Sequence, residues 1–166
     1  GISNYPPAQA IKAINILREL KTPFVLNQIP YNIINRYHED NGLLQLMADE
    51  GVGCIIFCPL AQGLLSGRYL NGIPEDSRAV RNRTTYKELL SKNPKAVVTA
   101  AQITQEWITI LNQLNQIAVK RGQTLAQMAV AWLLSRTGVT SALVGASRPQ
   151  QIMETVKALD NLVFSR

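Results

Sequence analysis

The sequence predicts an α/β fold with a parallel sheet, in which the chain forms roughly half of a (β/α)8 TIM barrel. Short apolar segments typical of strands alternate with segments of helical periodicity, as in parallel α/β proteins. Their spacing is that of barrel units, and eight such units need about 250 residues, whereas this chain has 166. A doubly wound sheet would place a G-x-G-x-x-G turn after its first strand, and the sequence contains no such turn.

The first half of the chain contains three predicted strands and two predicted helices. Gly1-Ile2 is read as the end of a strand. The helix over 7–20 has prolines at its start and apolar residues along one stripe. A short strand follows at 24–28, and a helix over 43–50 begins after Asn-Gly and ends at a glycine. The segment 52–57 is almost entirely apolar, which predicts a strand covered on both faces.

The second half contains three predicted helices and one predicted strand. The helix over 103–121 has a predicted core face at helical spacing, made of Ile103, Trp107, Ile110, Leu114 and Ile117. Thr124 and Gln127 form a capping-box pair for the next helix, whose predicted core face is Leu125, Met128, Trp132 and Leu133. A short strand at 141–144 and a helix over 149–159 complete the pattern.

The segment 70–95 is predicted to be a long basic loop, because it combines glycine, prolines and many charges without a clear period. Seven Lys and Arg residues against three Asp and Glu residues between 68 and 95 give +4 (7 − 3) of the formal net charge of +6. Such a loop binds polyphosphate or an anionic substrate, or is simply solvated. The interleaved aromatic residues typical of nucleic-acid binding are absent, so we expect no nucleic-acid partner.

Composition predicts a single cytoplasmic domain over residues 1–166. A hydrophobic content of 46% argues against intrinsic disorder. The longest apolar runs are much shorter than the ~20 residues of a membrane span, and the first residues lack a leader pattern. We therefore expect no membrane association.

The cysteines and the single histidine are not expected to act in chemistry. Cys54 and Cys58 on one strand would lie about 13 Å apart, too far for a disulfide. No second cysteine pair or histidine cluster joins them, so no metal site is predicted. Cys54 is interpreted as a core residue and Cys58 as a neighbour of the ligand groove. His38 is interpreted as a solvated loop residue, with a contact to substrate as the alternative.

Function in a parallel barrel lies on the loops that follow the strands. Four predicted strand ends carry polar or glycine residues directly after apolar ones, namely Ser3-Asn4, Asn27-Gln28, 57–63 and 145–148. The glycine-containing turn 63–67 allows a ligand to approach the backbone closely. Ser147-Arg148-Pro149 lies at a predicted helix start, where free N–H groups favour an anion. Ordinary caps and turns use the same residue types, so each signal alone also fits a purely structural role.

Four segments together, in order and spacing, resemble the C-terminal half of an aldo-keto reductase. They are Gly1-Ile2-Ser3-Asn4, Asn27-Gln28-Ile29-Pro30-Tyr31-Asn32, the run from Pro59 to Tyr69, and Gly145-Ala146-Ser147-Arg148. The similarity points to the branch that holds bacterial L-glyceraldehyde 3-phosphate reductases and potassium-channel β subunits. It implies a barrel that binds NADP(H) in extended form, with this chain providing strands five to eight.

The resemblance also implies the cofactor-binding residues. Ser3, Asn4 and Gln28 would bind the nicotinamide carboxamide, and Phe57 would stack on the ring. The residues lining the pyrophosphate would be Cys58, Pro59, Leu60, Gln62 and Gly63, with Arg68 and Arg78 clasping the cofactor. The 2′-phosphate and adenine side would be formed by Gly145, Ser147, Arg148, Gln151 and Glu154. Thr155 stands where relatives often have asparagine.

The catalytic Asp, Tyr, Lys and His of that family belong to the first half of the barrel, so no catalytic residue is predicted in this chain. The complete protein is expected to reduce aldehydes or ketones with NADPH, and the chain alone to be inactive. The alternative is a non-catalytic regulatory module that resembles channel β subunits. The expected partner is a small carbonyl compound, which the sequence does not identify. Open strand edges predict that the isolated half associates into homo-oligomers or aggregates.

Overall fold

The computed structural model describes residues 1–92 and 97–164. The chain, predicted as one domain, divides into two compact units, each described below by itself. The first unit consists of Gly1–Pro59 together with Ala129–Arg166, and the second of Leu60–Met128. In the described part of the chain, no helix is both long and apolar enough to cross a bilayer.

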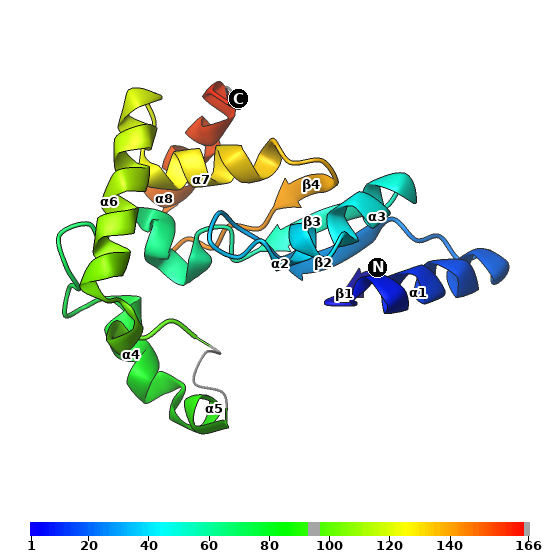
Figure 1. The fold of residues 1–166 in the computed structure, drawn as a ribbon, viewed down its shortest axis with the longest axis horizontal. Helices are drawn as coiled ribbons and strands as arrows, with labels where there is room; N and C mark the ends of the chain where they lie inside the picture. The colour runs from blue at the N-terminus through cyan, green and yellow to red at the C-terminus, as the bar shows by residue number, and fades with distance from the viewer. Residues whose placement is uncertain (93–96, 165–166) are drawn as a thin grey trace. The chain divides into compact units, whose positions relative to one another are not determined.

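The first unit is built on a four-stranded parallel sheet (Figure 1). Its strands are β1 (Ile2–Ser3), β2 (Leu26–Pro30), β3 (Gly53–Phe57) and β4 (Val139–Ala142), in the spatial order β1-β2-β3-β4. All four predicted strands are therefore confirmed, and so is the parallel sheet. The predicted strand at 24–28 begins two residues too early and the one at 141–144 two residues too late.

The connections of the first unit are helical. The helices are α1 (Pro7–Glu19), α2 (Tyr37–Asp40), α3 (Leu43–Asp49) and α8 (Pro149–Val156), with a 3-10 turn at Lys157–Asp160. Proline occupies the first turn of both α1 and α8, where its missing N–H would have had no helical partner. The Asn41 side chain accepts a hydrogen bond from Leu43 N at the start of α3. Gly51, with φ of +68°, follows the end of that helix as predicted.

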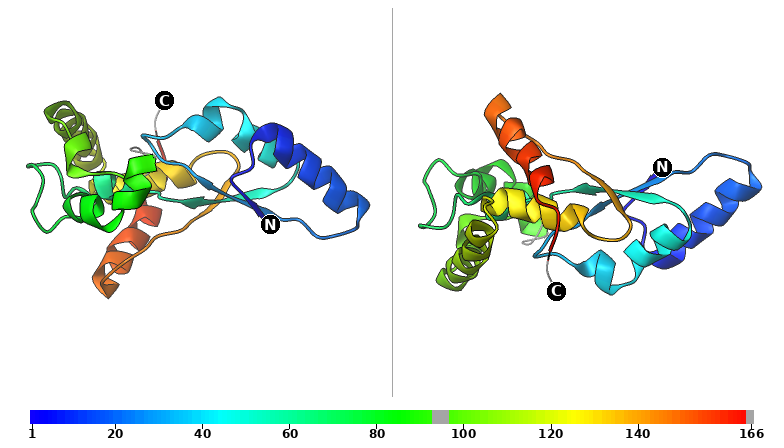
Figure 2. Two further views of the ribbon diagram at one scale, coloured as in Figure 1. Left: turned by 90° about the horizontal axis from the view of Figure 1, so that it is seen from below. Right: turned by 90° about the horizontal axis from the view of Figure 1, so that it is seen from above.

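Strand register separates the side chains of the sheet into two faces. Ile29 and Ile56 are paired and buried, whereas Gln28 and Ile55, also paired, point to the other face. The helices α1 and α3 lie on the face of the buried pair (Figure 2). The prediction that 52–57 is covered on both faces is wrong for this structure, because Ile55 and Phe57 are only half-buried.

The core of the first unit lies between this sheet face and the helices. Its buried residues come from α1, β2, α3, β3, the end of α7 (Leu125–Leu134) and the residue before β3. They include Ala10, Ile14, Ile29, Leu43, Met47, Val52, Ile56 and Leu133. Cys54 is fully buried among them, as predicted, and burial raises the pKa of its thiol to about 11. The two cysteines form no disulfide.

His38 corrects the sequence interpretation. The polar segment 35–40 contains the short helix α2, and His38 faces inward with only 6% of its surface exposed. Its Nδ1 is buried without a hydrogen-bond partner, and burial lowers the pKa of the imidazole. A polar sequence favours a solvated loop, but one turn of helix is enough to direct a single side chain into the core.

His38 is expected to make stability depend on pH. The folded state keeps the imidazole neutral, while the unfolded chain binds a proton near pH 6.5, so stability falls as pH is lowered through that value. We expect the free energy of unfolding to decrease between pH 7.5 and pH 5 and His38→Leu to flatten this slope, measured by urea unfolding at each pH. An unchanged slope in the variant would contradict this assignment.

The second unit is mainly helical. Its elements are a 3-10 segment at Ala61–Ser66, α4 (Arg78–Thr85), α5 (Lys87–Lys92), a 3-10 turn at Ala100–Gln102, α6 (Gln105–Lys120) and the start of α7. The prediction of a loop over 70–95 is wrong where α4 and α5 form, and residues 93–95 lie outside the described residues. The Ser77 hydroxyl caps α4 by accepting from Val80 N, so the helix begins without an apolar stripe long enough to reveal its period.

The capping prediction for α7 is confirmed. Thr124 Oγ1 accepts from Gln127 N at 3.2 Å, and Gln127 Oε1 accepts from Thr124 N at 2.9 Å. The predicted core face of α6 is partly wrong, since Ile110 and Ile117 are 37% and 51% exposed while Leu111 is fully buried.

Candidate functional site

The carboxyl ends of the four parallel strands bring three of the predicted groups to one edge of the sheet. Ser3 and Asn4 lie at the end of β1, Phe57 ends β3, and the segment 145–148 follows β4. Parallel strands end at the same edge, so these groups share it although the sequence separates them by up to about 140 residues.

Ser3, Asn4 and Gln28 are directly connected. Ser3 Oγ donates to the Gln28 carbonyl oxygen at 3.0 Å, and Asn4 N donates to the same oxygen at 3.0 Å. Asn4 adopts a left-handed conformation, with φ of +60°, which asparagine tolerates better than most residues. All three residues are exposed. Their hydroxyl and side-chain amides can both donate and accept, which suits a planar carboxamide.

Phe57 lies beside this group. It pairs with Pro30, two residues after Gln28, and alternation along β3 places it on the sheet face of Gln28. Cys58 follows immediately with φ of +55°, so the chain turns sharply at the end of the strand. The ring is half-buried. A flat aromatic side chain beside polar amides offers a stacking surface for a heteroaromatic ring.

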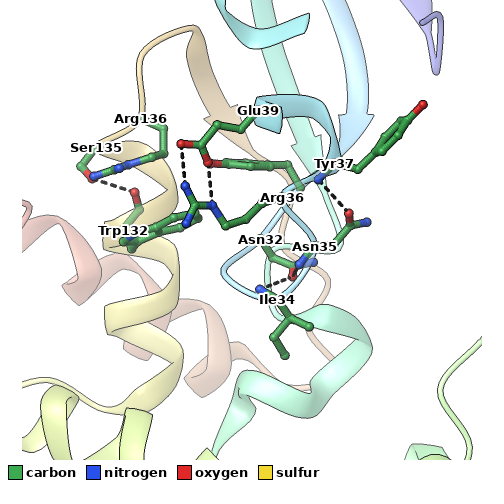
Figure 3. Close-up of polar contacts among 10 residues, drawn as sticks. Asn32, Ile34, Asn35, Arg36, Tyr37, Glu39, Trp132, Ser135 and Arg136 are labelled. Atoms are coloured by element: carbon green, nitrogen blue, oxygen red, sulfur yellow. Dashed lines mark hydrogen bonds and ion pairs between the residues drawn. The ribbon is translucent and has the colours of Figure 1, made fainter. Parts of the chain in front are cut away.

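The loop after β2 is fastened by a cluster that sequence reasoning missed (Figure 3). Tyr31 stacks on Trp132 with ring centroids 5.5 Å apart, and the Arg36 and Arg136 guanidinium carbons lie 5.8 and 5.0 Å from the Trp132 ring centroid. Glu39 accepts hydrogen bonds from Arg36 Nε and Nη2, both at 2.9 Å, and from Tyr31 Oη at 2.6 Å. This cluster ties the loop to the end of α7.

The electrostatics of that cluster follow from its hydrogen bonds. Arg36 holds the pKa of the Glu39 carboxyl below its usual range, mainly through their hydrogen bonds. Burial, followed by the bond to Glu39, raises the pKa of the Tyr31 phenol well above its ordinary value. Tyr31 therefore stays protonated and donates to Glu39. Its hydrogen bond and its ring contact hold the loop in place.

The start of α8 is a second polar group at this edge. Gln151 Oε1 accepts from Ser147 N at 2.8 Å, Ser147 Oγ at 3.2 Å and Arg148 N at 3.3 Å. Gln151 thus fixes the turn before the helix. The Ser147 and Arg148 side chains and Glu154, one turn later, are exposed, as is Gly145. A helix start with a neighbouring guanidinium favours a phosphate.

Pro59, the last residue of the first segment of the first unit, is buried. The remaining predicted cofactor residues belong to the second unit, and two of them already have partners. Gln62 Oε1 accepts from Val98 N at 3.0 Å, and the Arg68 guanidinium pairs with Asp76 and lowers the pKa of that carboxyl. Gly63 has φ of +104°, so it meets the requirement for a residue without Cβ. Leu60 and Arg78, the latter the first residue of α4, complete this set, whose cofactor role stays a prediction.

No cluster of three or more His, Cys, Asp or Glu side chains suited to a metal occurs among residues 1–92 and 97–164. What the described side chains offer is amide, hydroxyl, aromatic and guanidinium groups at strand ends. Such groups can bind and orient a ligand through hydrogen bonds, charge and stacking.

Comparison with known proteins identifies relatives over the whole chain. The aldo/keto reductase family matches residues 1–166. L-glyceraldehyde 3-phosphate reductase of Escherichia coli is 47% identical over 165 residues, covering 99% of this chain and 45% of that protein. A putative voltage-gated potassium channel subunit beta of Schizosaccharomyces pombe is 36% identical over 138 residues, covering 82% and 37%.

The fold comparison agrees. The crystal structure of a thermostable aldo-keto reductase with the inhibitor epalrestat matches with a TM-score of 0.62 at 23% identity, covering 97% of this chain and 42% of that one. The chain thus spans about half the length of these relatives, and its parallel sheet with helices is part of a (β/α)8 barrel, as predicted. The chain belongs to the aldo/keto reductase family.

Proposed function

We propose that this chain is the cofactor-binding half of an NADP(H)-dependent oxidoreductase that reduces an aldehyde or ketone to an alcohol. The observation that carries the proposal is the convergence of Ser3, Asn4, Gln28 and Phe57 at one sheet edge. Family membership and the similarity to a reductase support it. The proposed carbonyl substrate is a phosphorylated aldehyde, because the reductase relative is named for L-glyceraldehyde 3-phosphate.

The described residues fit an extended dinucleotide. Ser3, Asn4 and Gln28 would hold the carboxamide, and Phe57 would cover one face of the nicotinamide ring, so that the opposite face meets the substrate. Ser147 and Arg148 would bind the 2′-phosphate that distinguishes NADP(H) from NAD(H). When bound, the cofactor supplies a hydride to the carbonyl carbon.

The chain's own contribution is orientation. The Ser3 hydroxyl and the Asn4 backbone N–H both donate to the Gln28 carbonyl oxygen, so the two strand ends that carry the proposed carboxamide partners are joined before binding. Such preorganisation brings reacting atoms into contact distance, which accounts for a large share of enzymatic rate enhancement. The proton that completes carbonyl reduction would come from the other half of the barrel, where the family resemblance places the catalytic tyrosine.

NADPH reduction of glyceraldehyde 3-phosphate tests the proposal. The chain alone and the chain joined to the amino-terminal half of the Escherichia coli reductase are compared by loss of nicotinamide absorbance. Loss only in the joined protein supports the proposal. Tight NADPH binding without turnover in the joined protein would favour the regulatory alternative. The similarity to a channel subunit supports that alternative. If neither the chain alone nor the joined protein binds NADPH, both the reductase proposal and the regulatory alternative are refuted.

Arg148 is expected to determine cofactor preference. Replacing Arg148 with Ala in the joined protein removes a charge-assisted contact and should weaken NADPH binding about 10- to 100-fold, with NADH binding unchanged. Nicotinamide fluorescence titration measures both. Lys157→Ala, which removes an exposed cation from the turn after α8, is the matched control. Equal losses for NADPH and NADH would contradict the role.

A further inference from the structure

Asn32 connects the ends of two neighbouring strands. Pro30 of β2 pairs with Phe57 of β3, so the residues that follow them leave the sheet side by side. Asn32, two residues beyond Pro30, is buried with 4% of its surface exposed. A polar side chain at that depth needs hydrogen-bond partners, and Asn32 finds them on both strand exits.

The side chain of Asn32 uses both ends of its amide. Its Oδ1 accepts from Ile34 N at 3.0 Å and Asn35 N at 2.9 Å, which shapes the loop after β2 (Figure 3). Its Nδ2 donates to the Cys58 carbonyl oxygen at 3.0 Å. An amide carries an acceptor oxygen and a donor nitrogen on the same carbon, whereas a carboxylate carries acceptors alone.

The bond to Cys58 is made to a residue with a left-handed backbone conformation. Cys58 has φ of +55°, a conformation that residues with a Cβ rarely adopt unless the surroundings hold them there. Asn32 is such a constraint, since it fixes the carbonyl of that same residue. The preceding residue is Phe57, so the constraint acts on the exit of β3 at the aromatic ring.

We infer that Asn32 is a positioning residue for the nicotinamide: it holds Cys58 in its left-handed conformation and thereby sets the orientation of Phe57. The inference rests on the proposed function for the ligand, though the hydrogen bonds stand independently of it. Asn32 itself is buried and acts through the backbone of Cys58, so it is distinct from the residues that would contact the cofactor.

Asn32→Asp separates the two ends of the amide. The variant keeps the acceptor for Ile34 N and Asn35 N but replaces the donor to Cys58 with a second acceptor. The loop is therefore retained, while the hydrogen bond from Asn32 Nδ2 to the Cys58 carbonyl oxygen, called the clamp below, is lost. Asn35→Asp, the same chemical change at an exposed position in the same loop, is the control. Both are made in the full 166-residue chain and in the joined protein described above.

The first readout requires no cofactor. Iodoacetamide should label Cys58 in preference to Cys54, which is fully buried and has a raised thiol pKa. Peptide mass spectrometry identifies the labelled site. Loss of one hydrogen bond should change the Cys58 labelling rate about 3- to 10-fold in Asn32→Asp and leave it unchanged in Asn35→Asp. An unchanged rate in Asn32→Asp would overturn the clamp.

The second readout is NADPH affinity in the joined protein. Asn32→Asp should weaken NADPH and NADH binding equally, about 3- to 10-fold, because the nicotinamide end is common to both. Altered labelling with unchanged affinity would overturn the positioning role while leaving the proposed function intact. If the unmodified joined protein binds neither cofactor, the proposed function fails and the positioning role fails with it, whereas the labelling result still reports on the clamp.

Discussion

Trp132→Ala is expected to lower the free energy of unfolding by about 3–4 kcal/mol. Truncating a packed tryptophan removes its apolar contacts and leaves a cavity in their place. The ring is stacked on Tyr31 and contacted by two guanidinium groups. Aromatic pairs add about 0.5–1.5 kcal/mol beyond burial, and each cation–π contact about 0.5–1 kcal/mol at a partly exposed site. Tyr31 and Arg36 would lose a packing surface together.

Urea unfolding followed by circular dichroism measures this loss. Trp132→Phe keeps a ring against Tyr31 and should recover most of the stability, while Tyr37→Ala, at a side chain that is 60% exposed, should cost less than about 1 kcal/mol. A loss for Trp132→Ala no greater than that of Tyr37→Ala would show that the cluster contributes little to stability.

The sequence predicts the alternation of strands and helices well, because apolar periodicity and turn residues are local properties. The parallel sheet follows from that alternation, and the Thr124–Gln127 capping box is encoded within four residues. The helix α4 is missed for a complementary reason. Its start depends on the Ser77 cap and its buried residues are only Ala79 and Asn82, too few to give a visible period.

The candidate site is less predictable than the fold. Strand ends identify Ser3, Asn4 and Phe57 as neighbours, since parallel topology alone brings them to one edge. The sequence does not show that the Gln62 amide is engaged by Val98, 36 residues away, or that Arg68 pairs with Asp76. Such contacts depend on side-chain packing between distant segments, so residue type alone cannot distinguish a ligand-binding amide from a structural one.

The tyrosine–tryptophan cluster and Asn32 illustrate the same limit. Trp132 lies at a helical core position and is correctly interpreted as packing, yet its partners come from a loop about 100 residues earlier. The local signal for Asn32 is an asparagine shortly after a strand, which commonly forms a turn with its own backbone. That signal predicts the bonds to Ile34 and Asn35 but not the bond to Cys58.

Gly138→Ala should cost about 3 kcal/mol or more, because the position combines a left-handed backbone with a close contact. Gly138 has φ of +83°, and a Cβ there would lie 2.5 Å from the Leu44 backbone oxygen in α3. Neither a rotamer change nor a small side-chain shift relieves a contact with buried helix backbone. Gly42→Ala and Gly51→Ala are matched controls in the same unit, with φ of +80° and +68° and open space around the added methyl group.

The controls isolate the steric term. Each should lose only about 1–2 kcal/mol from the left-handed conformation, so the excess for Gly138→Ala in urea unfolding reports the contact with Leu44, and no excess would refute it. The consequence extends to the site. The Gly138 carbonyl accepts from Cys54 N at 3.1 Å just before β4 begins, so a displaced Gly138 would shift β4 against β3. Because Ser147 and Arg148 follow β4, the same substitution should also weaken NADPH binding in the joined protein. The absence of a Cβ at Gly138 would then help to place the proposed phosphate-binding turn.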